Sequence, residues 1–247
     1  MKQIIYIFTL LLLASCGQQK SEQKAATVSD KKTPNKNTTD QQNLKVEQNL
    51  TNFLPQGYVI FEKLYGDLNK DGSDDCVLII KGTDKNQIIT DENRGKLDRN
   101  RRGIIVLFNK NNHYELAVKN YNCFSSENED GGVYYAPELY VDIEKGNLTV
   151  HFGHGRYGYW KYTFKFQNID FELIGYDQSE DRGPIVEKVL SINFLSQKKQ
   201  EKVNTNTNEN AEGGEEVFKE TWKKINVNRL IKLSEIKDFD ELDMTVY

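Results

Sequence analysis

Five polar residues between positions 67 and 75 have the types and the spacing of a cation-binding loop. The stretch reads DLNKDGSDD and is followed at once by the apolar run CVLII. If Asp67 is the first ligand, Asn69 is third, Asp71 fifth, the Ser73 carbonyl seventh and Asp75 ninth, as at the start of an oxygen-rich Ca²⁺ loop. A set of oxygen ligands favours Ca²⁺ over zinc or copper. We therefore predict a structural calcium site, the alternative being a solvated Asp/Asn/Gly turn.

The residues after the loop decide which kind of calcium loop this is. An EF-hand needs a bidentate acid at the twelfth position and a following helix, but that position is Leu78 within an apolar run. The pattern DxNxDGxxD before an aliphatic strand resembles the FG-GAP and VCBS type of repeat, over about residues 61–82. That resemblance implies a loop that braces β-structure. The chain holds no second DxNxDG, so a propeller of several such blades is not expected.

Two histidines form the next candidate group, in the stretch HFGHGRYGYW. His151 and His154 have no third ligand at a suitable spacing, so they are a weak zinc motif, and a hydrogen-bonded hairpin tip is the preferred interpretation. No GxSxG nucleophile elbow and no phosphate-binding glycine loop occurs. A non-enzymatic protein is therefore predicted. The alternative is a metal-dependent envelope hydrolase that uses His151, His154 and loop carboxylates.

The N-terminus predicts export and a lipid anchor. Residues 1–15 place one lysine before an apolar run that is too short for a comfortable membrane span, which is the order of a signal peptide. The stretch Leu-Ala-Ser-Cys-Gly that ends at Gly17 resembles the lipobox of bacterial lipoproteins, which implies that Cys16 is acylated. Residues 16–50 are polar and are expected to form a flexible tether. The predicted location is the cell envelope, most simply the outer membrane, facing the periplasm or the cell surface.

Composition limits the partners. The net charge is −4, so a nucleic-acid partner, which would favour a basic domain, is not expected. After lipidation of Cys16, two cysteines remain in an oxidising compartment. Cys76 and Cys123 can pair as a disulfide or remain two free thiols, and the sequence leaves both open. Exposed tyrosines near 134, 135 and 157 can contact an envelope protein or a glycan.

The rest of the chain predicts a mainly β fold, an antiparallel meander, sandwich-like or twisted-sheet domain with little helix. Residues 159–167 alternate strictly between aromatic and polar side chains, so one face packs on a core. Residues 77–80 and 104–108 are apolar on both faces and should be central strands. Further strands are expected at 58–65, 113–120, 138–144, 147–152, 171–177, 187–196 and 216–227.

We assign residues 51–247 to a single β-rich domain. Residues 197–216 are poor in apolar side chains and are expected to form a mobile insert. Residues 234–242 are expected to form a short helix capped by Ser234. The chain as a whole resembles uncharacterised Gram-negative envelope lipoproteins that carry a GDLNxDGxxD loop. The predicted function is a membrane-anchored binding or structural module with a Ca²⁺-stabilised β-hairpin loop.

Overall fold

The computed structural model describes residues 50–111, 113–130, 136–206 and 215–247, which belong to one compact unit spanning Gln42–Tyr247. The predicted leader, Cys16 and most of the tether lie outside the described residues. The strands are β1 (Tyr58–Gly66), β2 (Asp75–Gly82), β3 (Ile88–Asp91), β4 (Gly95–Asp98), β5 (Arg102–Lys110), β6 (His113–Phe124), β7 (Glu138–Glu144), β8 (Asn147–Gly153), β9 (Gly158–Gln167), β10 (Asp170–Arg182), β11 (Ile185–Asn193), β12 (Lys198–Asn204) and β13 (Phe218–Lys224). The 3₁₀ helices are η1 (Lys85–Gln87), η2 (Gly155–Tyr157) and η3 (Leu233–Glu235).

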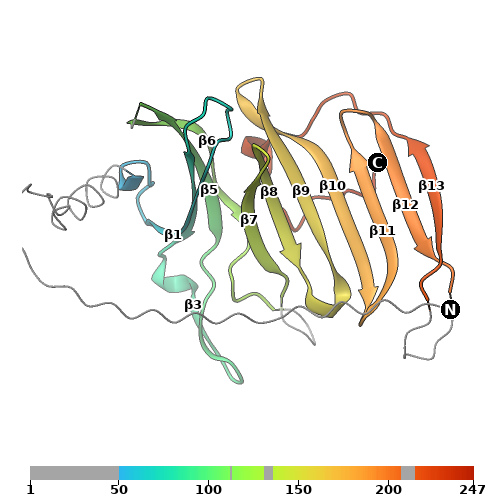
Figure 1. Cartoon of the computed structure of the whole chain (residues 1–247). Coiled ribbons are helices and arrows are strands. Elements are labelled where there is room, and N and C mark those ends of the chain that lie inside the picture. The colour runs from blue at the N-terminus through green and yellow to red at the C-terminus, as the bar shows by residue number, and fades with distance from the viewer. Residues whose placement is uncertain (1–49, 112, 131–135, 207–214) are drawn as a thin grey trace, which may run out of the picture. The chain divides into compact units, whose positions relative to one another are not determined.

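Two large antiparallel sheets form the domain, so the mainly β prediction is confirmed (Figure 1). The first has the order β1-β2-β5-β6, and the second runs from β13 through β12, β11, β10, β9 and β8 to β7. Strands β3 and β4 form a separate small hairpin. Several tight turns contain residues with positive φ, such as Lys145 and Gly146 between β7 and β8, as two-residue hairpins require.

The two central strands of the four-stranded sheet are buried on both faces, as their continuous apolar runs predict. Val77, Ile79 and Val106 face the main core, which the second sheet also lines with Val150 and Phe164. The opposite face packs into a smaller cluster of Leu50, Cys76, Leu78, Ile80, Ile105 and Leu107. Strands β2 and β5 are accordingly the central pair of this sheet.

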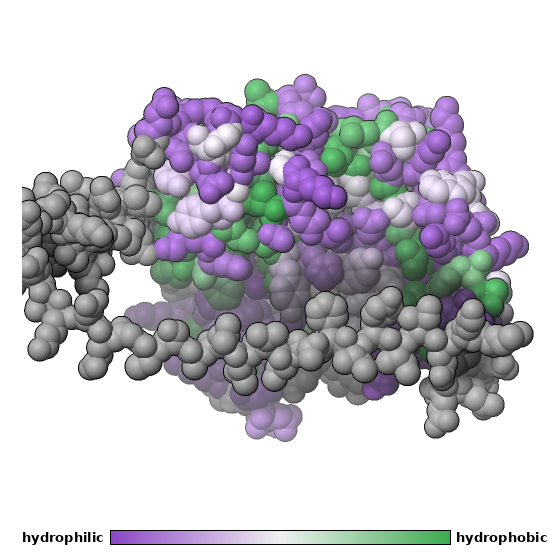
Figure 2. Space-filling model, in the orientation of Figure 1, coloured by the Kyte–Doolittle hydropathy of each residue, from purple (hydrophilic) through white to green (hydrophobic). Residues whose placement is uncertain are grey.

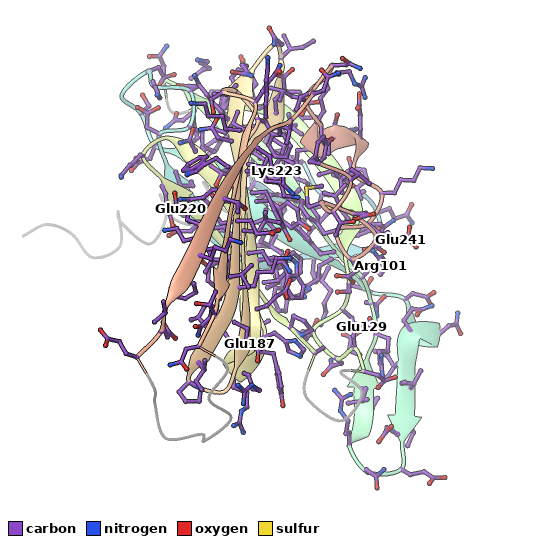
Figure 3. The ribbon with its side chains drawn as sticks, turned by 90° about the vertical axis from the view of Figure 1, so that its right-hand side faces the viewer. Arg101, Glu129, Glu187, Glu220, Lys223 and Glu241 are labelled. Carbon is purple, nitrogen blue, oxygen red and sulfur yellow. The ribbon has the colours of Figure 1, made fainter. Side chains whose placement is uncertain are left out.

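The seven-stranded sheet has one core face and one outer face. Core-facing side chains such as Tyr162 and Tyr176 pack against the first sheet and against residues 225–247. Figure 3, viewed towards the β13 edge, places Glu220 on one side of the sheet and Arg101, Glu129 and Glu241 on the other. Glu220 therefore marks the outer face. Figure 2 shows this side of the molecule as mostly hydrophilic, with apolar residues in separate small areas.

Two predictions about secondary structure are wrong. Lys198–Asn204, in the first half of the mobile insert expected at 197–216, forms β12 and pairs with both β11 and β13, whereas residues 207–214 lie outside the described residues. Backbone pairing with these two neighbouring strands stabilises β12, although its polar composition did not indicate a strand. The helix expected at 234–242 is limited to the 3₁₀ turn η3, which lacks a side-chain cap. Here Asn120 donates its amide to the carbonyl oxygens of Leu233 and Ile236, which replaces helical hydrogen bonding.

Candidate functional site

The acidic loop joins β1 to β2 and folds around its own carboxylates. Asp67 accepts hydrogen bonds from the backbone N–H groups of Lys70, Asp71 and Gly72, at 2.6, 3.2 and 3.0 Å. Asn69 Oδ1 accepts from the Asp71 amide at 2.9 Å. Lys70 and Gly72 both have positive φ, which turns the chain sharply enough to aim these amides inward.

Asp75 is the most constrained residue of the loop, with none of its surface exposed. Its Oδ2 accepts from the amides of Leu68 and Asn69 at 2.9 and 3.3 Å, and its Oδ1 accepts from the amide of Asn109 at 3.0 Å. The carboxylate therefore joins the loop to β5. Burial raises the pKa of Asp75, although these amide hydrogen bonds act in the opposite direction.

Lys110 supplies a positive charge at the mouth of the loop. Its Nζ lies 3.0 Å from Asp71 Oδ2, and this ion pair, with the Ser73 amide, lowers the pKa of Asp71. On the other side, the Lys70 side chain and the Asp67 carbonyl approach Gly146 in the β7–β8 turn. The loop thus contacts both large sheets.

The donor set of the loop suits a hard cation, because carboxylate and amide oxygens predominate and each oxygen can accept more than one partner. Asn69 Nδ2 is buried without a hydrogen-bond partner, but an N–H donor cannot ligate a cation, so only the Oδ1 atom of this residue can be a ligand. Across the described residues, however, no three His, Cys, Asp or Glu side chains are close enough together to hold a metal ion. Binding of Ca²⁺ would thus require Asp67, Asp71 and Asp75 to move closer and Asp71 to exchange Lys110 for the ion.

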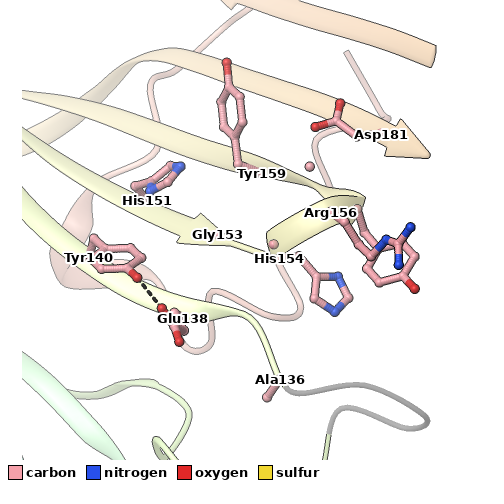
Figure 4. A pocket seen from close by; sticks show the side chains of 12 residues that line it. Ala136, Glu138, Tyr140, His151, Gly153, His154, Arg156, Tyr159 and Asp181 are labelled. Atoms are coloured by element: carbon pink, nitrogen blue, oxygen red, sulfur yellow. Dashed lines mark hydrogen bonds between the residues drawn. The ribbon is translucent and has the colours of Figure 1, made fainter. Parts of the chain in front are cut away.

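The two histidines lie in a different place, an open groove on the outer face of the seven-stranded sheet (Figure 4). His151 is on β8 between the rings of Tyr140 and Tyr159, with centroid distances of 5.8 and 5.3 Å. Burial and nearby Lys161 lower its pKa, which favours the neutral imidazole at physiological pH. His154 follows β8, packs on Tyr157, and keeps a buried Nε2 atom without a hydrogen-bond partner.

The groove has a volume of about 580 Å³, in the range of small-molecule sites. Glu138, Arg156 and Asp181 add charged groups to its aromatic lining, and the Tyr140 hydroxyl donates to Glu138. This site follows from the pairing of β7, β8 and β9, so the sequence could point to its histidines and to Tyr157 but not to Tyr140 and Tyr159 as partners of His151. The acidic loop lies beside the β7–β8 turn, at the other end of β8. Within the described residues, the histidines of the groove and the carboxylates of residues 67–75 are therefore in separate places.

The disulfide alternative is wrong, since Cys76 and Cys123 are both free thiols. Cys76 belongs to the small cluster on one face of the four-stranded sheet, whereas Cys123 belongs to the main core on the other. The sheet itself separates the two sulfur atoms. Burial raises the pKa of Cys76 to about 11 and raises that of Cys123 further, so both are protonated packing residues.

Comparisons of the chain with protein-family models, curated proteins and solved structures found no significant match. None of the helices in the described ranges is long and apolar enough to cross a membrane.

Proposed function

We propose that the protein is a cell-envelope lipoprotein, held to the outer membrane at Cys16, whose β domain is a non-enzymatic binding module. The observation that carries this proposal is the groove of Figure 4, which is open to solvent and presents aromatic faces beside a few polar groups. More than half of its lining residues lie on strands β7 to β10, which give a binding surface a rigid base. The partner is an envelope protein or a glycan.

The acidic loop has a structural part in this proposal. Ca²⁺ binds the oxygens of Asp67, Asn69, Asp71, Ser73 and Asp75 and holds the β1–β2 connection against β5 and the β7–β8 turn. The loop's contacts with both sheets support this role, because an ion there would stabilise the packing of the two layers.

A calcium titration followed by thermal melting tests the proposed calcium site. For the full chain in mild detergent, Ca²⁺ at 100 times Kd should raise the free energy of unfolding by about 2.7 kcal/mol, since only the folded state holds the ligands together. Asp71→Ala should lose most of this increase. Asp74→Ala removes an adjacent exposed carboxylate outside the ligand pattern and should keep it. A wild-type melting curve that does not change with Ca²⁺ would exclude a stabilising calcium site in the loop.

The lipid anchor is tested at Cys16 itself. Cells fed radiolabelled palmitate should incorporate label into the wild-type protein, which should fractionate with membranes. Cys16→Ala should abolish the label and release the protein from washed membranes, because the acyl chains that hold it there are proposed to be attached to Cys16. Label that persists in Cys16→Ala would contradict acylation at this cysteine.

A further inference from the structure

The pairing of the seven strands creates one continuous row of residues across the outer face. The row begins with Tyr140 on β7 and His151 on β8 and ends with Trp222 on β13. Between them, one residue from each strand follows in register: Lys161, Asp177, Ser191 and Gln200. Six strand spacings of about 4.8 Å give the row a length of ~29 Å. This is enough for several sugar rings of a chain that crosses the strands.

Aromatic rings stand at both ends of this row. At the β7 end, Tyr140 is 51% exposed and lies beside His151, whose other side faces Tyr159 in the groove (Figure 4). At the β13 end, Trp222 is 59% exposed, and its Nε1 donates to Glu220, which fixes the indole at the edge. Exposed aromatic rings of this kind combine a large apolar face with a polar atom at the rim.

The middle of the row is polar and electrically balanced. Ser191 donates to Asp177 at 2.7 Å, and Lys161 lies directly opposite Asp177 on the neighbouring strand. Counting the row and the two rows that flank it, the lysines are Lys161, Lys198, Lys202 and Lys224. The acids in the same three rows are Glu138, Asp142, Asp177 and Glu220. Equal numbers of opposite charges favour an uncharged partner, whereas a polyanion would require a basic surface.

A second observation in the groove points to a ligand rich in hydroxyl groups. His154 lines the groove, and its buried Nε2 has no hydrogen-bond partner. A buried polar atom left unpaired is costly, and a hydroxyl can satisfy it whether it needs a donor or an acceptor. Arg156 and Asp181 lie along the same groove and add a donor and an acceptor of fixed type.

From this geometry we propose that an uncharged linear polysaccharide lies across the outer face, at right angles to the strands. The C–H faces of its sugar rings stack on Tyr140 and Tyr159 at one end and on Trp222 at the other. Its hydroxyls hydrogen-bond to His154 and to the polar residues between the two ends. The inference rests on the proposed binding function and names its ligand class.

The test compares short with long oligosaccharides, because only a long one can contact both ends of the row. The full chain in mild detergent is titrated calorimetrically with disaccharides and hexasaccharides of glucose, mannose, galactose and N-acetylglucosamine. At least one hexasaccharide should bind. Tyr140→Ala should lower the affinity for that hexasaccharide and for the disaccharide of the same sugar about three- to tenfold. This is the range expected for loss of one aromatic contact. Trp222→Ala should lower the affinity for the hexasaccharide alone, because a disaccharide held in the groove cannot reach β13.

Tyr65→Ala is the matched control, since Tyr65 is 50% exposed but lies on β1, outside the seven-stranded sheet. It should leave both affinities unchanged, and melting curves should show all three variants folded. Failure of every sugar to bind, or equal binding by wild type, Tyr140→Ala and Trp222→Ala, overturns the inference. Binding of an envelope protein at this face, with no binding of sugars, would contradict the polysaccharide proposal but agree with the proposed binding function. Palmitate label that persists in Cys16→Ala would contradict the lipid anchor of the proposed function. Sugar binding is measured separately, so that result would not affect the polysaccharide proposal.

Discussion

Replacing Asp75 with alanine should lower the free energy of unfolding by about 3 kcal/mol. The buried carboxylate accepts from the buried amide of Leu68 and the part-buried amides of Asn69 and Asn109. Its removal leaves these N–H groups without this partner, at about 1–3 kcal/mol for a fully buried one and less for the others. Relief from burying a charge offsets part of this loss, because burial already raises the pKa of Asp75. The melting temperature should fall by about 6–12 °C for a domain of this size.

Urea or thermal unfolding of the full chain in EDTA isolates this effect from any bound ion. Asp74→Ala is the matched control, because it removes the neighbouring carboxylate at an exposed position. Its effect should stay within about 0.5 kcal/mol. If Asp75→Ala melts at the wild-type temperature, Asp75 is not what holds the loop to β5.

The parts of the fold that sequence predicted are those with a local physical signal. Strict alternation over residues 159–167 identified β9, whose even-numbered side chains Trp160, Tyr162 and Phe164 pack in or against the core. Two-sided apolar runs identified β2 and β5 as central. The strands expected at 138–144 and 147–152 are joined by Lys145 and Gly146, and positive φ at these two successive residues matches the twist of antiparallel strands.

The strand β12 was missed because the sheet extends beyond the core. Alternation arises when one face is buried, yet β12 is at most half-buried along its length. Lys199 and Glu201 point to the core side but reach past the core, to the Tyr247 carbonyl and to Lys188. Hydrogen bonding to β11 and β13 defines this strand, and backbone pairing leaves no mark on composition.

The two candidate sites differ in the same way. The acidic loop is contiguous, so the spacing of Asp67 to Asp75 was enough to find it. The aromatic groove combines β7, β8 and β9, and only the register places Tyr140 opposite His151. Register depends on turns and on burial of the other face, so a row across seven strands cannot be read before the sheet is assembled.

Replacing Phe239 with alanine should cost about 3–5 kcal/mol, the largest loss we expect from one side chain. Phe239 is 2% exposed and lies in an irregular segment with little hydrogen bonding of its own. Its ring stacks on Phe124 at 5.1 Å and also contacts Phe152, Tyr162 and Phe164. It therefore joins β6 of the first sheet to β8 and β9 of the second. Truncation leaves a cavity between them, which the two rigid sheets cannot close by collapsing.

Equilibrium denaturation in urea measures this loss, with Phe218→Ala as the control. That variant makes the same change at an exposed phenylalanine on β13 and should shift the free energy of unfolding by less than about 1 kcal/mol. The Phe239 amide also donates to the Cys123 carbonyl at 3.0 Å, a bond that alanine keeps, so the loss reports on the ring. Equal stability of the two variants would mean that residues 225–247 cover the core without filling it. A loss confined to Phe239→Ala would establish this segment as the link between the sheets, and hence as part of what holds the outer face in register.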